Sequence, residues 1–191
     1  MGLSIGWMEI PADVEQASQT FRRVMAQVDE DDERLRRLGV DVDDPTSPDP
    51  RVIALGQRYE AAWEAFERAN RSGFSMGAGR MGASLAVMLH AGMVVNVFRP
   101  IAPIRAAYPD ETAYDTALDA YLRDRCGAAV IPAHKFCSSE GWLVSPQELR
   151  AALRHAPEVG RHPATGELLD WWVEWVEFLR GGSTHGGIHV S

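Results

Sequence analysis

The chain has 191 residues, of which 46% are hydrophobic and 24% are charged, and its formal net charge at pH 7 is -8. Length and composition are typical of a soluble globular protein, and we expect a single domain over residues 1–191. The acidic excess disfavours nonspecific nucleic-acid binding, because such binding depends on a basic surface.

The two cysteines, Cys126 and Cys137, are too few for a disulfide framework, and free thiols in a reducing compartment are the default. The first ten residues lack the basic region and the long apolar run of a signal peptide. The apolar run 81–98 approaches membrane-spanning length, but polar residues interrupt it at positions 84, 90 and 96. We therefore expect a cytoplasmic protein that does not cross a membrane.

The N-terminal part predicts a short strand at 3–10 and then an amphipathic helix that begins at Pro11 or Ala12. Residues 41–50 (DVDDPTSPDP) contain four aspartates and three prolines, which is typical of an exposed, flexible loop. A second helix is expected from Arg51 to about Ala69, with aromatic residues on its inner face.

The most apolar stretch, Met76 to Phe98, predicts a buried central helix. Ala78, Gly82 and Ala86 follow at steps of four and form one face, on which another backbone has room to approach closely.

The C-terminal part predicts helices at 110–125, 146–155 and 167–180. Before the second of these, Ser145 and Glu148 flank Pro146 as a capping box. Short strands are expected at the N-terminus, at 142–144 and at 188–190. The predicted fold class is α+β and mainly helical, with five to seven helices around the central helix and a small β-sheet.

Residues 77–82 (GAGRMG) match G-x-G-x-x-G, the phosphate-binding pattern of dinucleotide folds. That pattern must follow a strand, whereas the preceding residues 59–69 predict a helix, and no carboxylate lies about twenty residues downstream. A role in helix packing is therefore favoured. If an anion binds at this helix entry, Arg80 is the residue expected to contact it.

A set of cysteine and histidine side chains offers ligands for zinc or a nucleophile with a base. None of their spacings is diagnostic, so a metal site is disfavoured and ordinary thiols with a polar tail are the simpler interpretation. The set consists of Cys126, His134, Cys137, His185 and His189.

Three of the six tryptophans fall within five positions, at Trp171, Trp172 and Trp175. Because neighbouring side chains on a helix point in different directions, Trp171 and Trp172 cannot both face the same core. One of them therefore faces another layer of the protein, a partner or a ligand, and burial between two layers is the favoured alternative.

The motifs SEGWLVSPQE (139–148), W-x-x-W-x-x-F-L (172–179) and H-G-G-I-x-V (185–190) resemble those of a group of small uncharacterised actinobacterial proteins, to which no activity is assigned. Residues 74–93 are similar to the middle of such proteins. The resemblance implies a bacterial, stand-alone cytoplasmic domain and implies no catalytic residue or cofactor.

The sequence as a whole favours a binding protein that recognises a protein or small ligand through the Trp-rich C-terminal region, with Trp171, Trp172, Trp175 and Arg80 as contact residues. An enzyme or metal protein that uses the cysteine and histidine set is the alternative, and it requires those side chains to converge.

Overall fold

The computed structural model describes residues 2–44 and 46–191, which form a mainly helical α+β protein, as predicted. The chain separates into two compact units, one of residues 2–9 and 72–191 and the other of residues 10–71. The sequence did not indicate this division, because the helices of both units carry similar apolar stripes.

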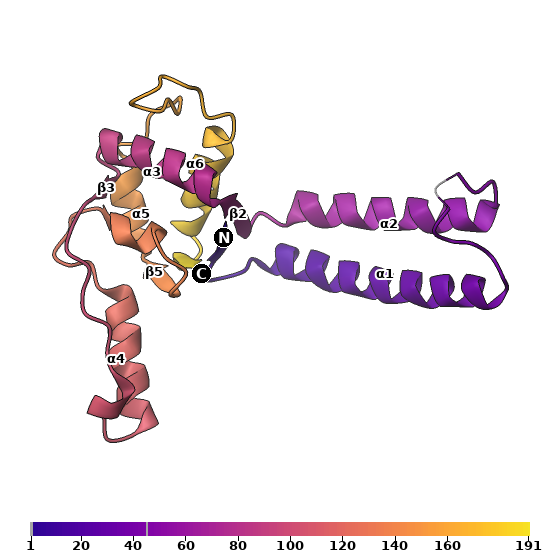
Figure 1. Ribbon diagram of the computed structural model, residues 1–191, viewed down its shortest axis with the longest axis horizontal. Coiled ribbons are helices and arrows are strands. Elements are labelled where there is room, and N and C mark those ends of the chain that lie inside the picture. Colours follow the sequence, from indigo (N-terminus) through magenta and orange to yellow (C-terminus); the bar gives the residue numbers. More distant parts are fainter. Residues whose placement is uncertain (1, 45) are drawn as a thin grey trace. The chain divides into compact units, whose positions relative to one another are not determined.

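Residues 10–71 form a helical hairpin, in which α1 (Ala12–Arg37) and α2 (Pro50–Ala69) run antiparallel to each other (Figure 1). Phe21 of α1 packs against Trp63 and Phe66 of α2, with ring centroids 5.7 and 4.7 Å apart. Asp49, the last aspartate of the predicted loop, caps the N-terminus of α2. Its side chain accepts a hydrogen bond from the backbone N–H of Arg51.

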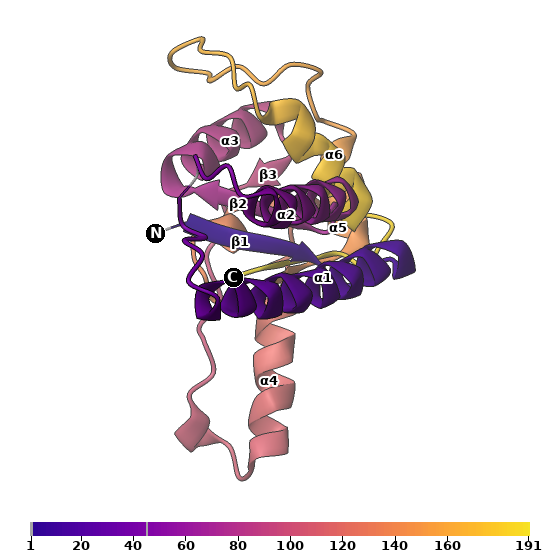
Figure 2. The same cartoon turned by 90° about the vertical axis from the view of Figure 1, so that its right-hand side faces the viewer.

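The larger unit is built on a four-stranded antiparallel sheet with the strand order β2-β1-β6-β5. The predicted strands are present as β1 (Gly2–Trp7), β5 (Trp142–Val144) and β6 (Ile188–Val190). Figure 2 shows β1 and β2 side by side, and their register pairs Leu3 with Met76. Alternate residues of β5 and β6 are buried, so one face of the sheet contributes to the core.

The central helix is shorter than predicted, because α3 spans only Ala78–Ala91. Its first expected residues belong instead to β2 (Gly73–Gly77), which the sequence analysis missed. Gly92 ends the helix in the left-handed conformation, with φ at 76°, and Val94–Val95 then form β3, which pairs in parallel with β4 (Ile131–Pro132). The glycine-rich motif therefore does follow a strand, although that strand lies in an antiparallel sheet.

The small-residue face of α3 is open at Ala78 and Gly82, whereas Ala86 is partly buried. Ala78 and Gly82 are exposed, and no heavy atom of the described chain lies within 4 Å of the position that a Cβ atom would take at Gly82. This face instead lines a groove of about 620 Å³, together with Leu3 and residues 136–139.

The remaining elements of the larger unit are the 3₁₀ helices η1 (Arg105–Ala107) and η2 (Ala133–Phe136) and the helices α4 (Glu111–Arg123), α5 (Pro146–Leu153) and α6 (Trp172–Gly182). The capping box at the start of α5 is confirmed. The last helix begins five residues later than predicted, because residues up to Trp171 form turns and a bridge between Arg161 and Leu168. None of the helices in the described part of the chain is long and apolar enough to cross a membrane.

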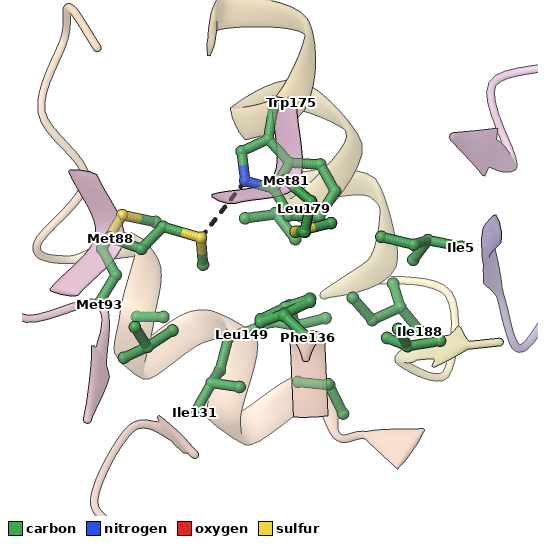
Figure 3. Close-up of a cluster of buried hydrophobic side chains, with 14 of the residues drawn as sticks. Ile5, Met81, Met88, Met93, Ile131, Phe136, Leu149, Trp175, Leu179 and Ile188 are labelled. Atoms are coloured by element: carbon green, nitrogen blue, oxygen red, sulfur yellow. Dashed lines mark hydrogen bonds between the residues drawn. The ribbon is translucent and has the colours of Figure 1, made fainter. Parts of the chain in front are cut away.

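Figure 3 shows part of the core of this unit, where side chains from α3, α5, α6 and the sheet meet. Trp175, Leu179 and Phe136 pack together at its centre and are almost completely buried.

Candidate functional site: an exposed apolar segment

Three large apolar side chains along the connection between β3 and η1 are exposed to solvent. Phe98 is 98% exposed, Ile101 is 93% exposed and Ile104 is 71% exposed. They are the most exposed large hydrophobic residues that the structure describes. Residues 98–104, called here the exposed segment, therefore carry three large apolar side chains that the described part of the chain leaves mostly uncovered.

The local sequence explains why the exposed segment does not fold onto the core. Pro100 and Pro103 lack a backbone N–H and restrict the residue before each of them to extended conformations, which opposes a helix. Residues 96–104 accordingly have no regular secondary structure. The apolar residues recur every third position, which is the repeat that brings side chains to one side of an extended polyproline helix.

Arg99 anchors the exposed segment to the folded unit. Its guanidinium donates hydrogen bonds to the Tyr121 hydroxyl, with the shorter N···O distance 3.0 Å, and also to the Glu140 carboxylate. The Tyr121 hydroxyl in turn donates to Glu140 at 2.9 Å, which closes a three-membered network. The guanidinium also lies over the ring of Trp142, 5.6 Å from the centroid. The apolar side chains therefore project from a backbone that is held in place at one point.

The hydrogen bonds of this network stabilise the charged forms of Arg99 and Glu140. Hydrogen bonds to Tyr121 and Glu140 raise the pKa of Arg99. Partial burial alone would raise the pKa of Glu140, but the hydrogen bonds from Arg99 and Tyr121 outweigh it and hold that pKa below its usual value. The ion pair therefore persists across the physiological pH range.

His134 lies beside the network, with its ring 4.7 Å from that of Trp142. Both of its ring nitrogens are buried, and neither has a hydrogen-bond partner in the part of the chain that the structure describes. Burial lowers the pKa of His134, and the positive charges of Lys135 and Arg99 lower it further. The folded protein therefore keeps this imidazole neutral.

This environment predicts a loss of stability in mild acid. The unfolded chain takes up a proton at His134 near its ordinary pKa of 6.5, whereas the folded chain resists protonation, so the free energy of unfolding decreases as the pH falls below about 6.5. Urea unfolding at a series of pH values measures this effect. His134→Phe should remove this part of the pH dependence; an unchanged slope in the variant would contradict the assignment to His134.

The predicted tryptophan site divides between core and surface. Trp172 and Trp175 are 1% and 0% exposed and form part of the core, so they are not available for a partner in this conformation. The favoured alternative, burial of both Trp171 and Trp172, therefore holds for Trp172, whereas Trp171 is only partly buried. The ring N–H groups of Trp172 and Trp175 have partners at the Pro157 carbonyl and the Met88 sulfur.

Trp171 and Arg80 are brought together at the surface of the larger unit. The Arg80 guanidinium lies 4.9 Å from the Trp171 ring centroid, and the indole N–H donates to the Ser84 hydroxyl at 2.9 Å. Trp171 is half-buried and is therefore the residue that faces outward, as the helical geometry required of one member of the pair. Arg80 covers one face of the Trp171 indole, immediately before α6, which gives this arginine a structural contact.

The cysteine and histidine side chains do not form a metal site. Among residues 2–44 and 46–191, no three His, Cys, Asp or Glu side chains lie close enough to hold a metal ion. His185 stacks on Trp7 with ring centroids 4.5 Å apart, and His189 is exposed on β6.

The surroundings of both cysteines favour the protonated thiol over the thiolate. Burial raises the pKa of the Cys137 thiol. Burial also raises the pKa of the Cys126 thiol, and the nearby negative charge of Asp124 raises it further. Because the thiolate is the nucleophilic form, neither environment activates a cysteine for attack. Cys137 contacts the Ala133 carbonyl through its sulfur, which is a structural role.

Sequence analysis missed the exposed segment, although its signal was present in the spacing. Phe98, Ile101 and Ile104 alternate with prolines in a stretch that periodicity assigns to neither helix nor strand. Apolar residues in such a stretch are as compatible with burial as with exposure, and only the folded chain distinguishes the two.

Comparison of the chain with protein-family models, with curated proteins and with solved structures finds no match. The resemblance to small actinobacterial proteins thus stays a prediction, and the physical properties of the exposed segment are the basis for assigning a function.

Proposed function

We propose that this chain is a non-catalytic binding protein that attaches to another protein through the exposed segment. The observation that carries the proposal is the exposure of Phe98 and Ile101, at 98% and 93%. Water-exposed apolar side chains that gather in one place are typical of interaction sites. This proposal keeps the binding function that the sequence favoured. It assigns the binding site to residues 98–104 instead of the Trp-rich C-terminal region.

The shape of the segment indicates the chemistry of the partner. A proline-containing chain with large apolar residues at every third position is the kind of ligand that fits a groove lined by aromatic and apolar side chains. Because the prolines and Arg99 restrict the backbone before binding, less conformational entropy is lost when the partner is bound. We therefore expect a protein partner with an apolar groove, and the net charge of -8 supports a protein rather than a nucleic acid.

A cytoplasmic location is part of the proposal. Its support is the presence of two free cysteines, Cys126 and Cys137, since unpaired thiols are usual in a reducing compartment. The resemblance to small actinobacterial proteins supports a bacterial setting.

The test is photo-cross-linking in the cells that naturally produce the protein. Phe98 is replaced by p-benzoylphenylalanine, and the same replacement at Ala120, an exposed residue on α4, serves as the control. We expect one discrete adduct from position 98 and none from position 120. Mass spectrometry of the adduct then identifies the partner.

A second substitution tests whether the adduct depends on the apolar side chains of the exposed segment. Ile101→Asp places a charge three residues along the segment and should abolish the adduct from position 98. Because Ile101 is 93% exposed, this substitution should leave the free energy of unfolding within about 0.5 kcal/mol of the parent value. The proposal fails if position 98 gives no adduct, or if Ile101→Asp leaves the adduct intact.

A further inference from the structure

His134 and Arg99 pack on the same tryptophan. The His134 ring meets the ring of Trp142 edge to face, with the centroids 4.7 Å apart, and the Arg99 guanidinium lies 5.6 Å from the Trp142 centroid. Trp142 is fully buried, and its indole N–H donates to the Ser138 hydroxyl at 2.9 Å, which fixes the ring in place. The imidazole therefore lies close to the residue that anchors the exposed segment, and the positive charge of Arg99 acts on it.

The position of His134 leaves its hydrogen-bonding capacity unused. Both ring nitrogens are buried, and neither has a partner among residues 2–44 and 46–191. A neutral imidazole carries one N–H donor, whereas a protonated one carries two donors and a positive charge. Protonation therefore makes this position more costly, because buried donors without acceptors are unfavourable and a buried charge without a partner is more so.

Two positive and two negative groups act on His134. The positive groups are Lys135, the next residue of η2, and Arg99. The negative groups are Asp124, which ends α4, and Glu140, which precedes β5. Burial lowers the pKa of His134, the two positive groups lower it further, and the two carboxylates oppose this only in part. A proton on His134 is therefore unfavourable as long as all four groups keep their positions.

Arg99 is the positive group that can move away. Its side chain is 42% exposed, so the guanidinium can exchange its protein contacts for water. Lys135 is 0% exposed and donates to the carboxylate of Glu148 at 2.9 Å, which holds it in the core. Departure of Arg99 removes one positive charge from the surroundings of His134 and also frees the Glu140 carboxylate, to which Arg99 is bound in the anchored state.

Glu140 is the acceptor available to a protonated His134. Partial burial raises the pKa of Glu140, but the hydrogen bonds from Arg99 and Tyr121 outweigh it, so this carboxylate is ionised in mild acid. Asp124 already accepts a hydrogen bond from the backbone N–H two residues along the chain, at 2.7 Å. Tyr121 is a neutral donor throughout this range, because burial raises its pKa.

We propose that protonation of His134 releases Arg99 from Glu140 and so detaches the exposed segment from its anchor. The imidazolium then takes the place of the guanidinium beside Glu140, and Arg99 moves into water. The inference rests on the proposed function in one respect, since the release regulates the binding site assigned there. Because an anchored backbone loses less conformational entropy on binding, the exposed segment binds its partner more tightly at neutral pH than in mild acid.

The direction of the pH effect follows from the two states of His134. In the anchored state its pKa lies below the ordinary value of 6.5, whereas in the released state one positive charge has left and one carboxylate has become free, so its pKa is higher. The released state therefore binds the proton more strongly, and the anchored state loses its advantage as the pH falls below the pKa of the released state. One proton changes the ratio of the two states by at most about tenfold for each pH unit.

The test is ¹⁵N relaxation NMR of the full chain, without a partner, at about one pH unit above and one below 6.5. The heteronuclear NOE of the Ile101 amide reports fast motion of the exposed segment, and that of Val176 on α6 shows whether the core stays folded. His134→Phe keeps an aromatic ring on Trp142 but binds no proton, and it retains the other histidines as a control for their titration. Arg99→Ala removes the anchor at every pH.

We expect the Ile101 NOE of the parent chain to decrease at the lower pH, with the released population rising at least about threefold. The NOE in His134→Phe should keep its high value, and that in Arg99→Ala should be low at both pH values. Arg99→Ala should also raise the pKa of His134, measured from its ring signals, because the coupling between two groups is reciprocal.

Three results overturn the proposal: an Ile101 NOE of the parent chain that does not change with pH, an equal decrease in His134→Phe, or a pKa of His134 that Arg99→Ala leaves unchanged. The last measurement needs no substitution of His134, so it decides the matter even if His134→Phe unfolds the chain. No partner takes part in these experiments. A missing adduct from position 98 therefore refutes the proposed function and does not bear on the release of Arg99.

Discussion

Glu148→Ala should lower the free energy of unfolding by about 3–5 kcal/mol, because it leaves a buried positive charge without its partner. The side chains of Lys135 and Glu148 are 0% and 1% exposed, and the Lys135 ammonium donates to Glu148 Oε1 at 2.9 Å. The same ammonium donates to the Leu143 carbonyl at 2.7 Å. Burial lowers the pKa of Lys135, and the Glu148 carboxylate acts in the opposite direction by favouring the charged form.

Glu148 has a second role that adds to the loss. Its Oε2 accepts hydrogen bonds from the backbone N–H and the hydroxyl of Ser145, both at 2.8 Å, and so closes the capping box of α5. Loss of a helix cap typically costs about 1 kcal/mol. One carboxylate therefore both neutralises the buried lysine and fixes the start of α5.

Chemical denaturation with urea measures the change, and a double variant is the control. Lys135→Met combined with Glu148→Leu removes both charges and leaves apolar groups of similar size, so it should recover much of the stability that Glu148→Ala loses. A loss below about 1 kcal/mol in Glu148→Ala would contradict the assignment of a buried, charged pair.

Trp175→Ala should also destabilise the protein by about 3–5 kcal/mol, the range expected for removing a large aromatic side chain from a core. Trp175 is 0% exposed and packs against Phe74, Phe136 and Phe178, with ring centroids 5.4, 5.8 and 5.7 Å away. Figure 3 shows its indole nitrogen directed at the Met88 sulfur, with an N···S distance of 3.4 Å.

Trp171→Ala is the matched comparison on the same stretch of chain. Trp171 is half-buried and packs against the edge of the core, and it also donates a hydrogen bond to Ser84 and contacts the Arg80 guanidinium. Its replacement should cost about 2–3 kcal/mol, from the hydrogen bond, the cation–π contact and the partial burial of the ring. Thermal or urea unfolding of the two variants distinguishes them. Equal losses would show that Trp171 belongs to the core as fully as Trp175 does.

Local signals in the sequence predicted the parts of the fold that depend on neighbouring residues. The capping box at Ser145 and Glu148 placed the start of α5 correctly, because cap chemistry acts within three residues. The short strands at 142–144 and 188–190 were also correct. Gly92 is the instructive error: an apolar run continues past it, yet its left-handed backbone ends α3.

The features that depend on distant contacts could not be predicted from the sequence alone. Nothing near Lys135 in the sequence indicates burial, and its partner is thirteen positions away on another element. Phe98 and Ile101 have the composition of core residues, and their exposure follows from where the chain turns, which tertiary packing decides. The division into two units likewise arises because α1 and α2 pack on each other.

The central claim, that the exposed segment is the binding site, is tested most directly by equilibrium binding of the partner identified by cross-linking. Its affinity for the parent chain is compared with that for the double variant Phe98→Ser and Ile101→Ser. Burying a phenylalanine and an isoleucine contributes about 1.5–3 kcal/mol each, so the double variant should bind at least about a hundredfold more weakly. Because Phe98 and Ile101 are almost fully exposed in the free protein, its stability should be unchanged. Binding of equal strength to both proteins would contradict the claim.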